Sequence, residues 1–164
     1  MILSILSDAV FAAIAGIGFG AISNPSRRAF PYIGILAAFG HACRFSLMNF
    51  CGFDIAAASL VGAFVVGMGS LLFGKKTRMP MTVLYIPALL PMIPGKYAYN
   101  MVFSLIMFFQ SIDNIEMRDH YMDMFFFNTV VAVVVIFLLA VGATFPLFIF
   151  PKVASSLTRK RSGN

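Results

Sequence analysis

The chain has 164 residues, of which 60% are hydrophobic and only 11% are charged. Soluble domains have about a quarter of their residues charged, so this composition excludes an ordinary soluble globule. The net charge of +6 does not indicate a nucleic-acid partner, because the basic residues cluster in short segments between apolar runs, where membrane orientation explains them.

Apolar runs of about twenty residues predict an all-α, polytopic transmembrane helical bundle. A β-barrel would alternate apolar and polar residues, whereas these runs are apolar on all sides. We expect one transmembrane domain over residues 1–151, followed by a basic cytoplasmic tail over residues 152–164. The predicted spans cover residues 2–22, 30–50, 55–73, 82–110 and 124–150.

The first and third spans carry small residues at helical spacing. Gly16 and Gly20 form a GxxxG pair in the first, and the third contains Ala58, Gly62, Ala63 and Gly67. Such faces let helix backbones approach closely. Both spans are therefore expected to pack against neighbouring helices through these faces.

The loops predict the orientation of the chain. Those after the first, third and fifth spans hold nine Lys and Arg residues, and those after the second and fourth hold one. Basic loops stay in the cytoplasm. The N-terminus is thus predicted to lie outside and the C-terminus inside. Residues 111–123, between the fourth and fifth spans, are expected to form an acidic polar loop.

The fourth span is predicted to be broken near its middle. Pro87, Pro91 and Pro94 interrupt it, and Gly95 follows. Each proline removes a backbone donor and clashes with the preceding turn. Broken helices of this kind form the binding sites of secondary transporters. We expect two half-helices in series that cross the membrane once; a kink used only for packing is the alternative.

The residues at and after this break are the candidate substrate-binding group. Lys96 lies near the predicted midplane, beside the positive end of a half-helix, and both features favour an anion. A lysine that extends to the membrane interface is the alternative. The tyrosines could bind a polar substrate or only hydrogen-bond carbonyls freed by the kink. The group comprises Pro91, Pro94, Gly95, Lys96, Tyr97, Tyr99 and Asn100.

Three further polar residues lie within predicted spans. His41 and Arg44 are three apart on the second span and so share one helix face. Histidine suits proton coupling, although one that hydrogen-bonds between helices fits the pattern as well. Asp8 on the first span lies at the depth of Arg44, which predicts an Asp8–Arg44 ion pair with Asp54 as the rival partner.

No arrangement of residues indicates an enzyme. Ser/His/Asp and Cys/His constellations are not discernible, and no metal cluster or cofactor motif is present. Cys43 and Cys51 are eight apart on one predicted helix, about 12 Å, which is too far for a disulfide. The sequence therefore predicts no catalytic residue, no metal and no cofactor.

Several motifs, in the same order, resemble the small subunit of the threonine/serine exporter family, and the likeness covers about residues 9–150. The most specific feature is the combination of G-H-x-x-R at 40–44 with P-M-x-P-G-x-x-A-Y at 91–99. The other matching segments are Ile17–Ala21 and the turn Asn24–Arg28.

The resemblance implies a subunit of a proton-driven secondary exporter of threonine and serine in the bacterial inner membrane. It corresponds to the C-terminal half of exporters made of one or two chains, so it also implies a larger membrane subunit as partner. Some two-chain systems of the family are linked to succinate export, which makes a dicarboxylate the alternative substrate. A non-transporting scaffold that stabilises a partner is the alternative from another class.

Overall fold

The structure, a computed structural model, describes residues 2–151, and over this range it contains six α-helices, two short 3-10 helices and no strand. The predicted all-α fold is confirmed. Four helical segments of the described part are long and apolar enough to cross a membrane; they contain α1, α2, α3 and α6. The helices are α1 (Ile2–Ile22), η1 (Arg27–Ala29), α2 (Phe30–Phe50), α3 (Ile55–Thr77), α4 (Met81–Leu89), η2 (Leu90–Met92), α5 (Gly95–Gln110) and α6 (Ile115–Ile149).

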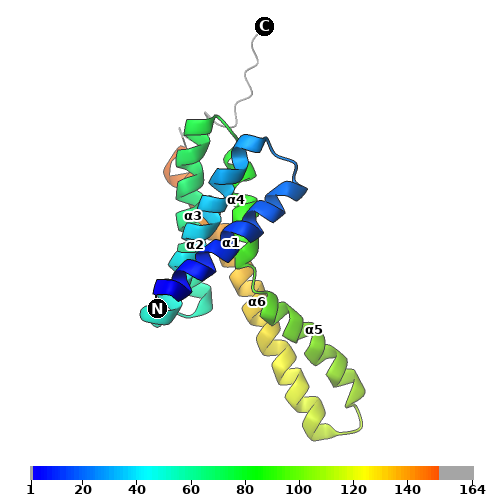
Figure 1. Cartoon of the computed structure of the whole chain (residues 1–164). Coiled ribbons are helices and arrows are strands. Elements are labelled where there is room, and N and C mark those ends of the chain that lie inside the picture. The colour runs from blue at the N-terminus through cyan, green and yellow to red at the C-terminus, as the bar shows by residue number, and fades with distance from the viewer. Residues whose placement is uncertain (1, 152–164) are drawn as a thin grey trace. The chain divides into compact units, whose positions relative to one another are not determined.

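Within the expected transmembrane domain, the described residues form two compact units. Residues 2–92 with 138–151 form the first, which we name the bundle unit, and residues 93–137 form the second, the hairpin unit. Figure 1 shows α1 to α4 of the bundle unit from blue to green. The predicted basic tail, residues 152–164, lies outside the described residues.

The bundle unit is built on very close helix contacts. A methyl group added at Gly16 of α1 would lie 2.7 Å from the Cβ atom of Ala37 of α2, and one at Gly67 of α3 would lie 2.5 Å from the Ala143 carbonyl oxygen of α6. The predicted small-residue packing faces are therefore confirmed. The buried apolar core beside them consists of Ala29, Ile33, Leu36, Ala37, Val66, Leu84 and Ala88.

The third helix is longer than the predicted span, because it continues to Thr77 rather than ending near residue 73. Lys75 and Lys76 lie in its last turn, where the negative end of the helix dipole favours cations. Arg78 then adopts the left-handed conformation (φ 57°, ψ 32°) and ends the helix.

The predicted break in the fourth span is confirmed. Regular helix ends at Met92 of η2 and begins again at Gly95, with Pro94 as the N-cap residue of α5. Pro87, by contrast, is accommodated inside α4. The crossing of the two halves in series stays a prediction.

The hairpin unit consists of α5 and the first part of α6, which run antiparallel (Figure 1). Two aromatic contacts join them: the ring centroids of Tyr97 and Phe127 are 6.4 Å apart, and those of Phe103 and Tyr121 are 6.5 Å apart.

The prediction of an acidic loop over residues 111–123 is mostly wrong, because α6 already begins at Ile115. The Asn114 side chain accepts a hydrogen bond from the Met117 amide at 3.2 Å, which caps the new helix. The cap makes polar residues 115–123 helical. The 35-residue helix α6 is about 52 Å long, so it exceeds the ~30 Å hydrocarbon core of a bilayer.

Candidate functional site

Two polar contacts join one face of α2 to other segments of the bundle unit. The first joins His41 to Asp8 of α1, with 2.5 Å between Nδ1 and Oδ2. Both side chains are partly accessible, at 17% for His41 and 26% for Asp8. A histidine and a carboxylate in hydrogen-bond contact can share and pass on a proton.

The second contact joins Arg44 of α2 to the broken segment. Its Nη1 atom donates to the backbone carbonyl oxygen of Met92 at 2.5 Å. In a continuous helix this oxygen would accept from the amide of Lys96, four residues on. The break removes that donor, and Arg44 supplies another.

The predicted Asp8–Arg44 pair is therefore wrong. Asp8 meets His41, one helical turn before Arg44, and the carbonyl freed at Met92 takes the guanidinium. The rival partner, Asp54, instead caps α3 by accepting from the Ala56 and Ala57 amides at 2.8 and 2.9 Å. The position of each residue along its helix predicted which residues lie near one another. It did not predict which polar groups form contacts.

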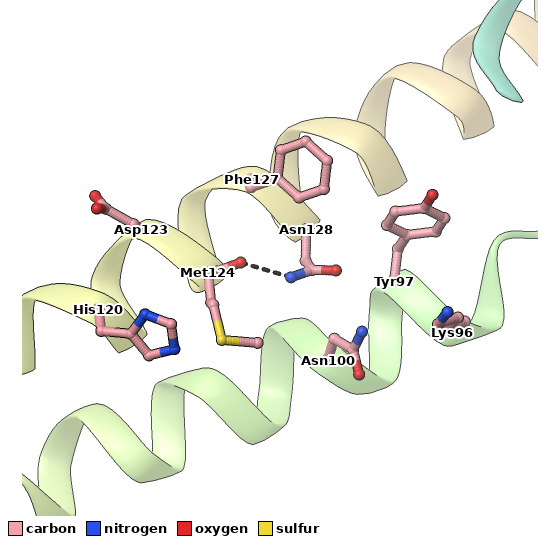
Figure 2. A pocket seen from close by; sticks show the side chains of 8 residues that line it. All are labelled: Lys96, Tyr97, Asn100, His120, Asp123, Met124, Phe127 and Asn128. Atoms are coloured by element: carbon pink, nitrogen blue, oxygen red, sulfur yellow. Dashed lines mark hydrogen bonds between the residues drawn. The ribbon is translucent and has the colours of Figure 1, made fainter. Parts of the chain in front are cut away.

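An open cavity of about 520 Å³ lies between the two helices of the hairpin unit (Figure 2). Three residues of the predicted substrate-binding group line it from α5, namely Lys96, Tyr97 and Asn100. The structure thus brings these three together. The wall contributed by α6 consists of His120, Asp123, Met124, Phe127 and Asn128.

The polar residues of the α6 wall were missed as site residues. His120, Asp123 and Asn128 recur at helical spacing, a signal that is visible only once residues 115–123 are known to be helical. Asn128 is only 5% exposed. Its amide donates to the Met124 carbonyl at 2.6 Å, and in Figure 2 its side chain lies in the space between the helices.

The other predicted residues do not line this cavity. Tyr99 is 69% exposed and stacks on Phe103, with 6.2 Å between ring centroids. Pro91 belongs to η2 of the bundle unit, Pro94 is the buried N-cap of α5, and Gly95 is its exposed first residue.

Several amides at the amino end of α5 already have hydrogen-bond partners. The Gly95 amide donates to the Ile93 carbonyl at 2.8 Å, and the amides of Tyr97 and Ala98 donate to the Pro94 carbonyl at 3.0 and 3.1 Å. Among the described residues, the Lys96 amide has no backbone partner.

Lys96 carries the available positive charge of the cavity. The ion pairs within residues 2–151 are Asp8–His41 and Arg118–Asp119, so neither Lys96 nor Asp123 belongs to one. Lys96 also lies in the first turn of α5, where the dipole adds positive potential. The cavity therefore presents an unpaired cation, a carboxylate and two side-chain amides, which can bind a small polar molecule that carries charge.

Comparisons with known proteins identify the family. The family model described as "Threonine/Serine exporter, ThrE" matches residues 8–149, which include both polar contacts and the cavity. A comparison with solved structures finds no match. The match covers most of the chain, and the chain belongs to the threonine/serine exporter family ThrE, a family of membrane transporters.

Proposed function

We propose that this chain is one subunit of a secondary exporter of threonine and serine in the bacterial inner membrane. The observation that carries the proposal is the cavity of the hairpin unit, in which predicted residues of α5 face polar side chains of α6. Family membership supports the substrate class.

The cavity suits a small zwitterion. The Lys96 ammonium, next to the positive end of α5, would attract the substrate carboxylate. Asp123 at the other wall would attract the substrate ammonium, and the Asn100 and Asn128 amides can bind its hydroxyl group. A dicarboxylate such as succinate would also meet Lys96 favourably, but its second carboxylate would face Asp123 rather than a cation.

We place proton coupling at the Asp8–His41 pair. Its support is the 2.5 Å contact between a carboxylate and an imidazole inside a family of transporters. Protonation would turn a neutral imidazole into a cation beside the carboxylate, so the charge of the bundle unit would change with proton binding. A transport cycle can use such a change to favour one state over another.

A larger membrane subunit completes the exporter in this proposal. Its support is that Lys96 has no acidic partner among the described residues, although a charge at membrane depth calls for one. The orientation follows from the loops: nine basic residues on one side and one on the other favour an external N-terminus and a cytoplasmic C-terminus.

Export assays test this function. Cells that lack the chain, the partner or both would be loaded with L-threonine, L-serine or succinate, and the efflux rates compared. We expect threonine and serine efflux to require both chains. Restored efflux when the partner alone is overproduced would instead indicate a scaffold, and loss of succinate efflux alone would replace the substrate with a dicarboxylate.

A further inference from the structure

Met92, the last residue of η2, is held from two directions within the bundle unit. Its side chain is fully buried. It lies over two glycines: a methyl group added at Gly62 of α3 would come within 2.7 Å of its Cε atom, and one added at Gly40 of α2 within 3.6 Å of its Sδ atom. A side chain at Gly62 would overlap Met92, whereas a methyl group at Gly40 would only touch its sulfur. We name the surface formed by Gly40 and Gly62 the glycine seat.

The backbone of Met92 is held as well. Its carbonyl oxygen is one of the groups that the break leaves without a helical donor, and Arg44 donates to it at 2.5 Å. A buried carbonyl without a partner carries a free-energy cost, because it has lost its hydrogen bond to water. Arg44 removes that cost at the point where regular helix stops.

Arg44 has the complementary requirement. A guanidinium inside a helix bundle needs acceptors, and the two acids predicted as its partners are engaged elsewhere: Asp8 with His41, and Asp54 with the amino end of α3. The Met92 carbonyl is the hydrogen-bond acceptor that residues 2–151 provide for Arg44. A cation without an acid and a carbonyl without an amide therefore satisfy each other.

We propose that Arg44 and the glycine seat form an anchor that fixes Met92, the residue at which the chain leaves the bundle unit for the break. Arg44 is then a positioning residue for transport rather than a ligand of the substrate carboxylate. This inference rests on the proposed export function. The anchor keeps the start of the segment Ile93–Gly95 in a fixed position while the substrate binds to residues that follow this segment.

Substitutions of Arg44 test the anchor. Arg44→Met removes the donor and is expected to lower the maximal rate of L-threonine efflux by ~10-fold or more, since a hydrogen bond from a charged group is worth about 1.5–3 kcal/mol. Arg44→Lys keeps a donor and should restore much of that rate. The internal threonine concentration at half-maximal rate should stay the same in both.

The matched control is Arg118→Met, because Arg118 pairs with the exposed Asp119 and lies outside the anchor. Its efflux should equal that of the unsubstituted chain. A raised half-saturation concentration in Arg44→Met, with the maximal rate unchanged, would overturn the proposal and make Arg44 a substrate ligand.

The glycine seat gives an independent test without any change of charge. Gly62→Ala would place a methyl group 2.7 Å from the Met92 Cε atom and 2.9 Å from the Gly40 carbonyl oxygen, and it should lower the maximal rate as Arg44→Met does. Gly18→Ala, which meets open space, should not. If Gly62→Ala fails to accumulate in membranes, Met92→Ala empties the seat without adding atoms, with the exposed Met48→Ala as its control. Full activity of Met92→Ala would overturn the anchor.

Thiol labelling separates this inference from the export function. Ala88 lies one turn before Met92 and is fully buried, so Ala88→Cys in a background with Cys43→Ser and Cys51→Ser should react slowly with N-ethylmaleimide in membranes. Adding Arg44→Met should raise the labelling rate ~10-fold, and adding Arg118→Met should not. Equal rates would refute the anchor even if export is confirmed, and faster labelling would support it even if the chain exports another substrate.

Discussion

The polar groups of the bundle unit and those of the hairpin unit are of the same chemical kinds but are used differently. In the bundle unit, Asp8 contacts His41 and Arg44 contacts the Met92 carbonyl. In the hairpin unit, Lys96 and Asp123 line an open cavity and neither belongs to an ion pair of the described residues.

In the proposed function, this difference separates groups that hold the protein together or move protons from groups that bind the substrate. A paired group in a close-packed bundle has little to offer a substrate, because binding would break an existing contact. An unpaired group in an open cavity gains a partner when a substrate binds. Four changes test this division, from the largest expected effect to the smallest.

The largest effect should come from the close packing of the bundle unit. In Gly67→Leu the new side chain would overlap the Ala143 backbone, which no rotamer change can relieve. We expect almost complete loss of folded protein, measured as the monodisperse fraction after detergent extraction and size exclusion. Gly18→Leu, which faces open space, is the control, and equal yields from the two would disprove the tight packing.

The second test removes the unpaired cation of the cavity. Lys96→Met should lower L-threonine efflux by ~10–100-fold, because the substrate would lose a charge-assisted hydrogen bond, while the amount of protein in the membrane stays the same. Lys75→Met, at the exposed end of α3, is the control. Unchanged efflux would remove Lys96 from the site.

The third test concerns the paired groups. Asp8→Asn keeps the shape of the side chain but removes its charge, so His41 loses the carboxylate that it contacts. We expect threonine transport driven by an imposed pH gradient in membrane vesicles to fall ~10-fold, while threonine exchange without a gradient is retained.

The control for that experiment is Asp119→Asn, whose carboxylate is 65% exposed and pairs with Arg118. It should leave both activities intact. Equal loss of driven transport and exchange in Asp8→Asn would show that the Asp8–His41 pair is structural. The two units would then differ only in how closely they are packed, and not in proton transfer.

The smallest effect should come from one hydroxyl group in the cavity. Tyr97→Phe should raise the half-saturation concentration of threonine ~3–10-fold, the value of one neutral hydrogen bond. Tyr99→Phe provides a matched comparison on the same helix, because its ring is exposed and does not line the cavity. A larger effect at Tyr99 than at Tyr97 would place the substrate outside the cavity.

Several features could be predicted from the sequence because they depend on local chemistry. Apolar runs predict helices, since backbone groups in lipid must be satisfied internally. The bounds of α1 and α2 agree with the predicted first and second spans, and the break appears where Pro91, Pro94 and Gly95 predict it. Each of these outcomes depends on residues that are close in the chain.

Other features depend on single capping residues that were not recognised. Asn114 begins α6 nine residues before the predicted start of the span at residue 124, and this turns most of an expected acidic loop into one wall of the cavity. His120 and Asp123 can belong to the site because they lie on this helix rather than in a loop.

The sequence by itself determined an all-α membrane protein with a broken helix, because hydropathy, prolines and glycines act within one segment. Its place among transporters came from the resemblance to a family, which the family match supports. Only the tertiary structure decided which polar groups meet. Asp8 and Arg44 were predicted to pair, yet each has another partner: Asp8 contacts the imidazole of His41, and Arg44 donates to a carbonyl freed by the break. Such choices depend on distances between helices, which the order of residues along one helix does not contain.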